Sequence, residues 1–183
     1  MYINKQKISK IYLNRVSIDS AYYNRQQQFI KEYNIGDVLG GGLVAEVLGN
    51  NQYKIVSVEL FNDASSQYII WGDTANETFG RSFTDGITNT DAMLATDPLS
   101  ETAATISRAY NGGGFNDWYL PAIDELEPLY QNRVILGLNS NFYWSSTESS
   151  TTFAYVKSFG NGSNAISQKS SANNVRAVRI HTI

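Results

Sequence analysis

The sequence GGGFNDWYLPAIDELEPLYQNR, residues 112–133, decides the fold. It predicts a helix that begins after Pro121, because Asp124 and Glu125 then lie near the positive end of the helix dipole. Apolar side chains recur at the spacing of one helical face, which indicates burial on one side. Pro128 lies inside this helix, so we expect a break or kink there. The buried face would consist of Ile123, Leu126, Leu129 and Tyr130.

The segments on either side predict further elements. A helix is expected from Ser100, as its N-cap, to about Tyr110, since Gly112–Gly114 would stop it. The polar stretch from Gly72 to Pro98 lacks clear periodicity and predicts a long loop. Runs rich in β-branched and aromatic residues predict strands within 36–47, 53–60, 67–71, 142–144, 153–159, 165–169 and 174–180.

The composition excludes several kinds of chemistry. The chain has no cysteine and one histidine, which excludes disulfides, thiolate nucleophiles, Cys-ligated metals and His-based triads. We therefore expect no metal and no cofactor. The stretch GDVLGGGLVAEV, residues 36–47, lacks the Lys-Ser/Thr of a phosphate-binding loop and the spacing of a dinucleotide fingerprint. It predicts instead a strand that a neighbour approaches closely, and nucleic acid is not an expected partner.

The charges are arranged in blocks along the chain. The formal net charge is +4 over residues 1–34, −11 over 35–148 and +4 over 149–183. Blocks of opposite sign favour contact between chain segments, or between neighbouring subunits, through complementary faces. A chance distribution of solvated charges is the alternative, and the sequence leaves both open.

The first 34 residues contain a ten-residue repeat, in which Tyr2, Tyr12 and Tyr22 coincide. One strand and one turn fit this period, so residues 1–34 predict a small antiparallel ribbon. Such a ribbon is too small to be stable alone, which predicts a role in anchoring or oligomerisation. The repeat resembles the IxKIYLG strand repeats of virion proteins in tailed phages. An ordinary N-terminal hairpin of one globular domain is the alternative.

Three motifs in the remaining chain carry a second resemblance. GGGFNDWYLPAIDELEPLYQNR (112–133), FYWSSTESS (142–150) and NNVRAVRI (173–180) resemble, in this order, the signature of the Legionella collagen-like adhesin C-terminal family, which overlaps with the Fibrobacter paralogous-domain proteins. The resemblance covers residues 35–183. It implies an α+β, C-type lectin-like fold, with two helices flanking a twisted antiparallel sheet and long loops on one side.

The sequence departs from two branches of lectin-like proteins. Glu127-Pro128-Leu129 lacks the amide that follows proline in the calcium-dependent lectins, and Asn116-Asp117 precedes the predicted helix instead of lying in a late strand. Sugar binding through calcium is therefore not expected. The formylglycine-generating branch works through cysteines, which this chain lacks.

Several residues in the motifs have structural interpretations. Trp118 and Trp144 are expected in the core, because large aromatic side chains dominate small cores. Glu148 is expected to be a buried ion-pair partner of Arg176 or Arg179. Helix capping and solvated faces explain four further acids better than a catalytic carboxylate pair does. These acids are Asp117, Asp124, Glu125 and Glu127.

The polar surface of the last strands and their loops is the expected ligand-binding site. It combines an aromatic ring, amides and cations, which give rigid contact area and adaptable hydrogen bonding. The residues are Tyr155, Lys157, Asn161, Asn164, Lys169, Asn173 and Asn174.

These observations predict a structural protein of a phage virion. Residues 1–34 would bind other virion proteins or form a homo-oligomer, such as a trimer, and residues 35–183 would adhere to a glycan or protein of the host surface. A purely structural decoration protein is the alternative, and a carbohydrate-active enzyme is a third. The N-terminus has no signal-peptide pattern and no apolar run reaches 18 residues, so we expect synthesis in the host cytoplasm, assembly into the virion and no membrane insertion.

Overall fold

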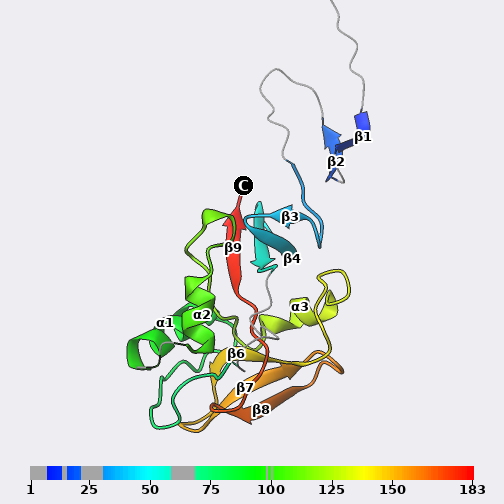
Figure 1. The fold of residues 1–183 in the computed structure, drawn as a ribbon. Coiled ribbons are helices and arrows are strands. Elements are labelled where there is room, and N and C mark those ends of the chain that lie inside the picture. The colour runs from blue at the N-terminus through cyan, green and yellow to red at the C-terminus, as the bar shows by residue number, and fades with distance from the viewer. Residues whose placement is uncertain (1–7, 14–15, 22–30, 59–68, 98, 100) are drawn as a thin grey trace, which may run out of the picture.

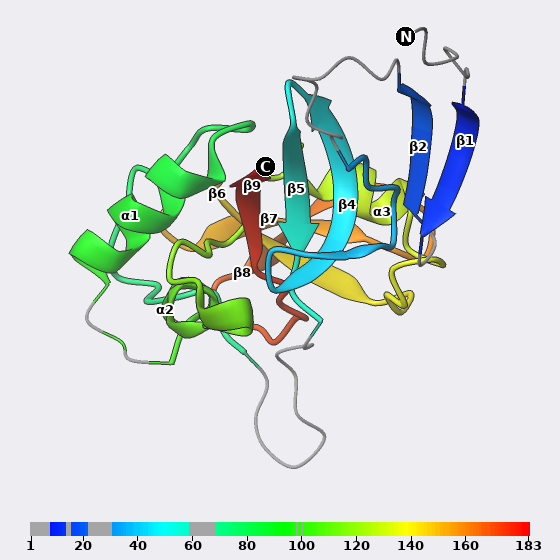
Figure 2. The same cartoon turned by 90° about the horizontal axis from the view of Figure 1, so that it is seen from above.

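The computed structural model describes residues 8–13, 16–21, 31–58, 69–97, 99 and 101–183. The chain is mixed helix and sheet, with every named pair of strands antiparallel (Figures 1 and 2). One sheet joins β1 (Ile8–Leu13) and β2 (Val16–Ala21); a second has the order β3 (Val38–Leu39), β4 (Gly42–Gly49), β5 (Gln52–Val56), β9 (Val178–Thr182); a third has the order β6 (Phe142–Glu148), β7 (Phe153–Ser158), β8 (Asn164–Gln168). The helices are α1 (Gly86–Thr96), α2 (Ala103–Ala109), the 3₁₀ turn η1 (Gly112–Gly114) and α3 (Leu126–Gln131).

The ten-residue repeat forms an antiparallel strand pair over its first two units. In its register Ile11 lies opposite Ile18, and Leu13 opposite Val16. This agrees with the strand-and-turn interpretation of the repeat. The third unit falls in residues 22–30, which lie outside the described residues.

The glycine-rich stretch 36–47 forms the β3–β4 hairpin, as its strand interpretation predicted. Gly40 and Gly41 make the turn with φ of +55° and +86°, a region that glycine enters without strain. Gly41 packs directly against the backbone of Gly112 in η1. The close approach of a neighbour, expected from the glycines, is therefore confirmed.

The segment that ends in β9 connects the two larger sheets. Asn174 exchanges backbone hydrogen bonds with β6, donating to Phe142 O at 3.0 Å and accepting from Trp144 N at 2.9 Å. Four residues later, Val178 exchanges two bonds of 2.9 Å with Tyr119 and pairs with β5. The chain thus runs along the third sheet and then completes the second.

Buried residues from the two larger sheets and from the helical segments form the core. Trp71, Trp118 and Trp144 have no exposed surface, which confirms the core assignment of Trp118 and Trp144. Ile123, Leu126 and Leu129 are also fully buried, as the periodicity of residues 112–133 predicted.

Helix α1 lies within the stretch 72–98, so the prediction of a long loop there was wrong. The helix begins after Asp85, whose carboxylate accepts from Thr88 N at 2.9 Å. Its buried residues are Gly86, Asn89, Thr90 and Met93. With one large apolar residue on the buried face, the segment has no hydrophobic period to detect.

The N-cap of α2 and the proline of α3 also differ from the expectation. Helix α2 is capped by Thr102, whereas Ser100 lies outside the described residues. Helix α3 begins at Leu126, so Pro128 lies in its first turn and not in its interior. Because the amide at this position has no partner within the helix, proline is tolerated there without the expected kink.

We expect Thr102→Ala to lower the free energy of unfolding by about 1 kcal/mol. Thr102 Oγ1 accepts from Thr105 N, and Thr105 Oγ1 accepts from Thr102 N, so the substitution removes half of a capping box. Urea denaturation measures the loss. Thr96→Ala, at an exposed position in the last turn of α1, is the control and should change stability by less than about 0.5 kcal/mol. Equal midpoints for both variants would contradict the assignment of the cap.

Candidate functional site

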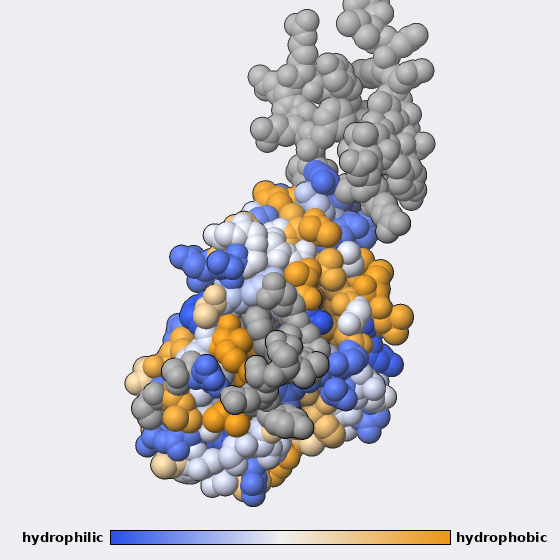
Figure 3. All heavy atoms as spheres, viewed as in Figure 1, coloured by the Kyte–Doolittle hydropathy of each residue, from blue (hydrophilic) through white to orange (hydrophobic). Residues whose placement is uncertain are grey.

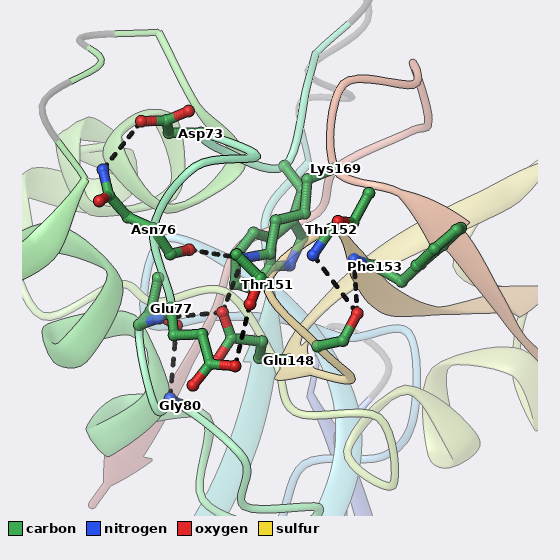
Figure 4. A network of polar contacts seen from close by, with 12 residues as sticks. Asp73, Asn76, Glu77, Gly80, Glu148, Thr151, Thr152, Phe153 and Lys169 are labelled. Atoms are coloured by element: carbon green, nitrogen blue, oxygen red, sulfur yellow. Dashed lines mark hydrogen bonds and ion pairs between the residues drawn. The ribbon is translucent and has the colours of Figure 1, made fainter.

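A buried ion pair joins the end of β6 to the segment after β8 (Figure 4). Lys169 Nζ donates to Glu148 Oε1 at 2.6 Å, and neither side chain is exposed. Lys169 also donates to Asn76 O at 2.9 Å and lies 4.7 Å from the ring centroid of Trp71. The Glu148 oxygens accept from Thr78 N at 2.9 Å and Phe79 N at 3.0 Å. This Glu148–Lys169 pair therefore fixes the loop 76–80 against the sheet.

The fixed loop displays a strained aromatic residue. Phe79 has φ of +59°, a region that bulky residues rarely adopt, and the residue is 71% exposed. Its backbone is held by the bond to Glu148, and Gly80 O accepts from Glu148 N at 2.7 Å. Such strain persists only where the surroundings impose it, and it gathers at functional sites. Among the described residues, Phe79 is the aromatic residue with the largest exposed fraction.

The side of β7 and β8 that carries Tyr155 packs partly on the core and leaves a second mixed surface exposed along β8. Tyr155 lies opposite Ile166 in the register, and the ring of Phe83 meets the ring of Tyr155 edge-on at 5.2 Å. Ile166 is 55% exposed, and Asn164 and Gln168 on the same side of β8 are exposed as well. We call this set (Phe83, Tyr155, Asn164, Ile166 and Gln168) the β7–β8 face.

Lys157 orients one amide of this face without itself being exposed. Its Nζ donates to Asn164 Oδ1 at 3.0 Å and lies 2.5 Å from Glu127 Oε2, with 3% of the side chain exposed. The hydrogen bond from Lys157 is the main cause of a lowered Glu127 pKa. Because Oδ1 of the exposed Asn164 accepts from Lys157, its Nδ2 group is the part of the amide that can donate to a ligand.

The acids of the sequence motifs are held in structural contacts. Asp117 accepts two bonds from Arg179, of 2.6 and 2.9 Å, and the hydrogen bonding by Arg179 lowers the Asp117 pKa. Glu125 accepts from Ala122 N at 2.9 Å, Gly86 N at 3.1 Å and the Tyr119 hydroxyl at 2.9 Å. Burial, with the nearby Glu125 charge, raises the Tyr119 pKa. Glu125 thus ties α1 to the start of α3.

Two expectations for these acids require correction. Glu148 pairs with Lys169 and not with Arg176 or Arg179, although it is the buried structural partner that was predicted. Glu125 occupies the N-cap position of α3 but its side chain makes no bond to that helix; the carboxylate is buried, not on a solvated face, and accepts from the first residue of α1, Gly86. The expected complementarity between charge blocks is confirmed within one chain, because acids of the middle block pair with three cations of the last. These cations are Lys157, Lys169 and Arg179.

The sequence of the chain matches the model of a known protein family. The family model described as the Lcl C-terminal domain matches residues 58–179. The chain belongs to the Lcl C-terminal domain family. The match contains the Asp-Trp and Tyr-Trp-Ser-Ser motifs entirely and nearly all of the last one, so the predicted resemblance is confirmed. A search of curated proteins finds no significant match.

Within this Lcl C-terminal domain, the seven predicted ligand residues fall into two groups. Asn161 and Asn164 are exposed, and Tyr155 and Asn173 are half-buried. Three others are buried, so their prediction as surface contacts was wrong: Lys157, Lys169 and Asn174. Their polar atoms bind other residues of the same chain. Lys157 pairs with Glu127, Lys169 pairs with Glu148, and Asn174 Nδ2 donates to Asn139 Oδ1 at 2.8 Å.

The predicted residues that remain accessible do not form one cluster. Tyr155 and Asn164 lie on the β7–β8 face, and Asn161 lies in the turn between the two strands. Asn173 instead bonds Ser167, whose side chain points to the opposite side of β8. The sequence reasoning missed Phe79, Phe83 and Ile166. The available signal for the first two was their apolar character within the otherwise polar stretch 72–98.

No helix among the described residues has the length and apolarity needed to span a bilayer. No group of three or more His, Asp or Glu side chains in the same residues is arranged to hold a metal ion.

Proposed function

We propose that this Lcl C-terminal domain is the adhesive part of a tailed-phage virion protein and has a C-type lectin-like fold. Phe79 and the β7–β8 face would contact a glycan or protein of the host surface. The observation that carries the proposal is the strained, 71% exposed Phe79, held by the buried Glu148–Lys169 pair. A protein interior that fixes an exposed aromatic residue in this way supports recognition by contact.

The chemistry of this surface suits weak binding of sugars or polar peptides. Aromatic rings such as Phe79 and Phe83 offer flat apolar area with little side-chain entropy to lose, and amides such as Asn164 donate to hydroxyl and carbonyl oxygens. Each contact is modest. Display of many copies on a particle would raise the avidity by about 10²–10⁴ over a single site.

The state of the buried acids supports a non-enzymatic role. Glu125 and Glu148 are buried, and both accept backbone N–H bonds as well as lysine contacts. Asp117 and Glu127 are each paired with a cation. Carboxylates occupied in this way are poorly placed to serve as the acid and base of glycoside hydrolysis, which need access to a substrate.

A second exposed surface supports attachment to other virion proteins. Val38, Val134 and Ile135 are 77%, 87% and 59% exposed, and Ile135 packs beside Gly36 near the start of the domain. Figure 3 shows apolar residues gathered on the corresponding side of the molecule. Residues 1–34 directly precede Ile35 and Gly36 in the sequence. We propose that they anchor or oligomerise the protein next to this exposed apolar surface.

The adhesion proposal predicts that Phe79→Ala and Phe83→Ala each weaken binding by about tenfold or more, equivalent to about 1.4 kcal/mol. Binding of the full chain to host cells and to a glycan array measures the loss. Ile183→Ala removes a side chain of similar exposure to Phe83, 42% against 44%, from the end of the other sheet and should bind normally. If the intact chain binds neither surface while particles still require it for assembly, the decoration role replaces adhesion.

A further inference from the structure

Strand β8 is an edge of its sheet, with an open row of backbone groups. The sheet order is β6-β7-β8, and Figure 1 shows β8 as the outermost strand. Ser158 N donates to Ser163 O, and Lys169 N to Thr152 O, both at 2.9 Å. With this alternation, the backbone N–H and C=O groups of the odd-numbered residues of β8 point towards β7. The N–H and C=O groups of the even-numbered residues therefore point away from the sheet.

The described chain leaves most of this row unpaired. The outward groups are those of Asn164, Ile166 and Gln168. Among the described residues, only Gln168 O receives a backbone bond, from Ser171 N at 2.8 Å. The strand reads Asn-Ala-Ile-Ser-Gln and so lacks charges and proline. Natural edge strands are usually protected by Lys, Pro or a bulge, and β8 has none of these devices.

The sequence of β8 is complementary to itself about its central residue. We propose that β8 pairs antiparallel with β8 of a second copy of this chain, about a twofold axis at Ile166. In that register Ile166 faces Ile166 of the partner subunit, and Asn164 faces Gln168 of the partner subunit. Apolar then meets apolar, amide meets amide, and no like charges oppose each other. The two Ile166 residues exchange both of their backbone bonds, as a hydrogen-bonded pair does.

The pairing extends the sheet without covering the β7–β8 face. The twofold axis of an antiparallel strand pair is perpendicular to the sheet, so both copies present the same side. A six-stranded sheet results, with two copies of Tyr155 and its neighbours side by side. A five-residue strand alone buries less area than a stable interface of about 1,200–2,000 Å². Association in solution is therefore weak and depends on concentration, and it strengthens where copies are held together.

Because the chain has no cysteine, a single introduced thiol tests the twofold axis directly. Ile166→Cys would place two thiols on residues whose Cα atoms are about 5.5 Å apart, within the range of about 4.4–6.8 Å for disulfides. Under mild oxidation of the full chain we expect a reducible dimer. Asn161→Cys is the control, since this exposed residue lies outside β8, in the turn that precedes it. It should cross-link at least tenfold more slowly.

Two further variants separate the backbone from the side chain. Ile166→Pro removes the outward N–H and leaves the bonds to β7, whereas Ile166→Thr keeps the N–H. In sedimentation experiments over a concentration series, the intact chain and Ile166→Thr should associate, and Ile166→Pro should not. Equal cross-linking of Ile166→Cys and Asn161→Cys, or association of Ile166→Pro equal to that of the intact chain, overturns the proposal. Adhesion is tested separately, because Phe79→Ala should lose binding and keep the pairing.

Discussion

Replacing Glu148 with glutamine is expected to lower the free energy of unfolding by about 3–5 kcal/mol. Lys169 has no exposed surface, and after the substitution its charge would face a neutral amide in place of the carboxylate, with Asn76 O and the ring of Trp71 as its other neighbours. A buried charge without its counter-ion is far more costly than a missing surface contact. The amide would also direct one NH₂ group at a backbone N–H that now donates to the carboxylate, at Thr78 or Phe79. Urea denaturation of the full chain measures the loss.

A surface ion pair provides the matched control for Glu148→Gln. Asp91 is 63% exposed and pairs with Arg108, so Asp91→Asn should change stability by less than about 1 kcal/mol. Adding Lys169→Met to Glu148→Gln removes the uncompensated charge and should recover part of the stability. If Glu148→Gln is no more destabilised than Asp91→Asn, Lys169 is not held as a buried cation, and the structural basis for the position of Phe79 is lost.

The helix in residues 112–133 shows what a local pattern can predict. Ile123, Leu126 and Leu129 recur at helical spacing and all three are fully buried, because one face of the segment packs on the core. The start of the helix was less predictable. Residues 123–125 form turns, stabilised by bonds from Gly86 and Tyr119 to Glu125, and these contacts come from elsewhere in the fold.

The candidate site was harder to predict because it depends on contacts between distant elements. Lys157 and Lys169 lie in a Ser- and Asn-rich segment, where cations are usually solvated. Their partners Glu127 and Glu148 come from α3 and β6, and no local pattern encodes such a pair. The exposure of Phe79 has the same origin, since its left-handed backbone is imposed by Glu148, which lies 69 residues further along the chain.

The Gly41→Ala substitution is expected to lower the free energy of unfolding by about 2–5 kcal/mol. Gly41 has φ of +86°, where a side chain costs about 1–2 kcal/mol. A Cβ there would also overlap the carbonyl group of Gly112, with Gly113 N at 2.8 Å, and overpacking of this kind typically costs a further 1–3 kcal/mol or so. Because both sides of the contact are backbone, neither can rotate away. Urea denaturation again measures the change.

Gly49→Ala separates the two causes. Gly49 has nearly the same φ, +84°, but a Cβ there meets nothing within 4 Å. Gly49→Ala should therefore lose only the part of the free energy of unfolding that comes from the positive φ. The difference between the two variants then measures the contact between the β3–β4 turn and η1. That difference also tests the extent of the domain, because Gly41 precedes the family match at residue 58. A loss at Gly41 no larger than at Gly49 would mean that the opening hairpin does not pack against the turn before α3. A larger loss would make residues 35–57 an integral part of the folded domain, as the pairing of β5 with β9 requires.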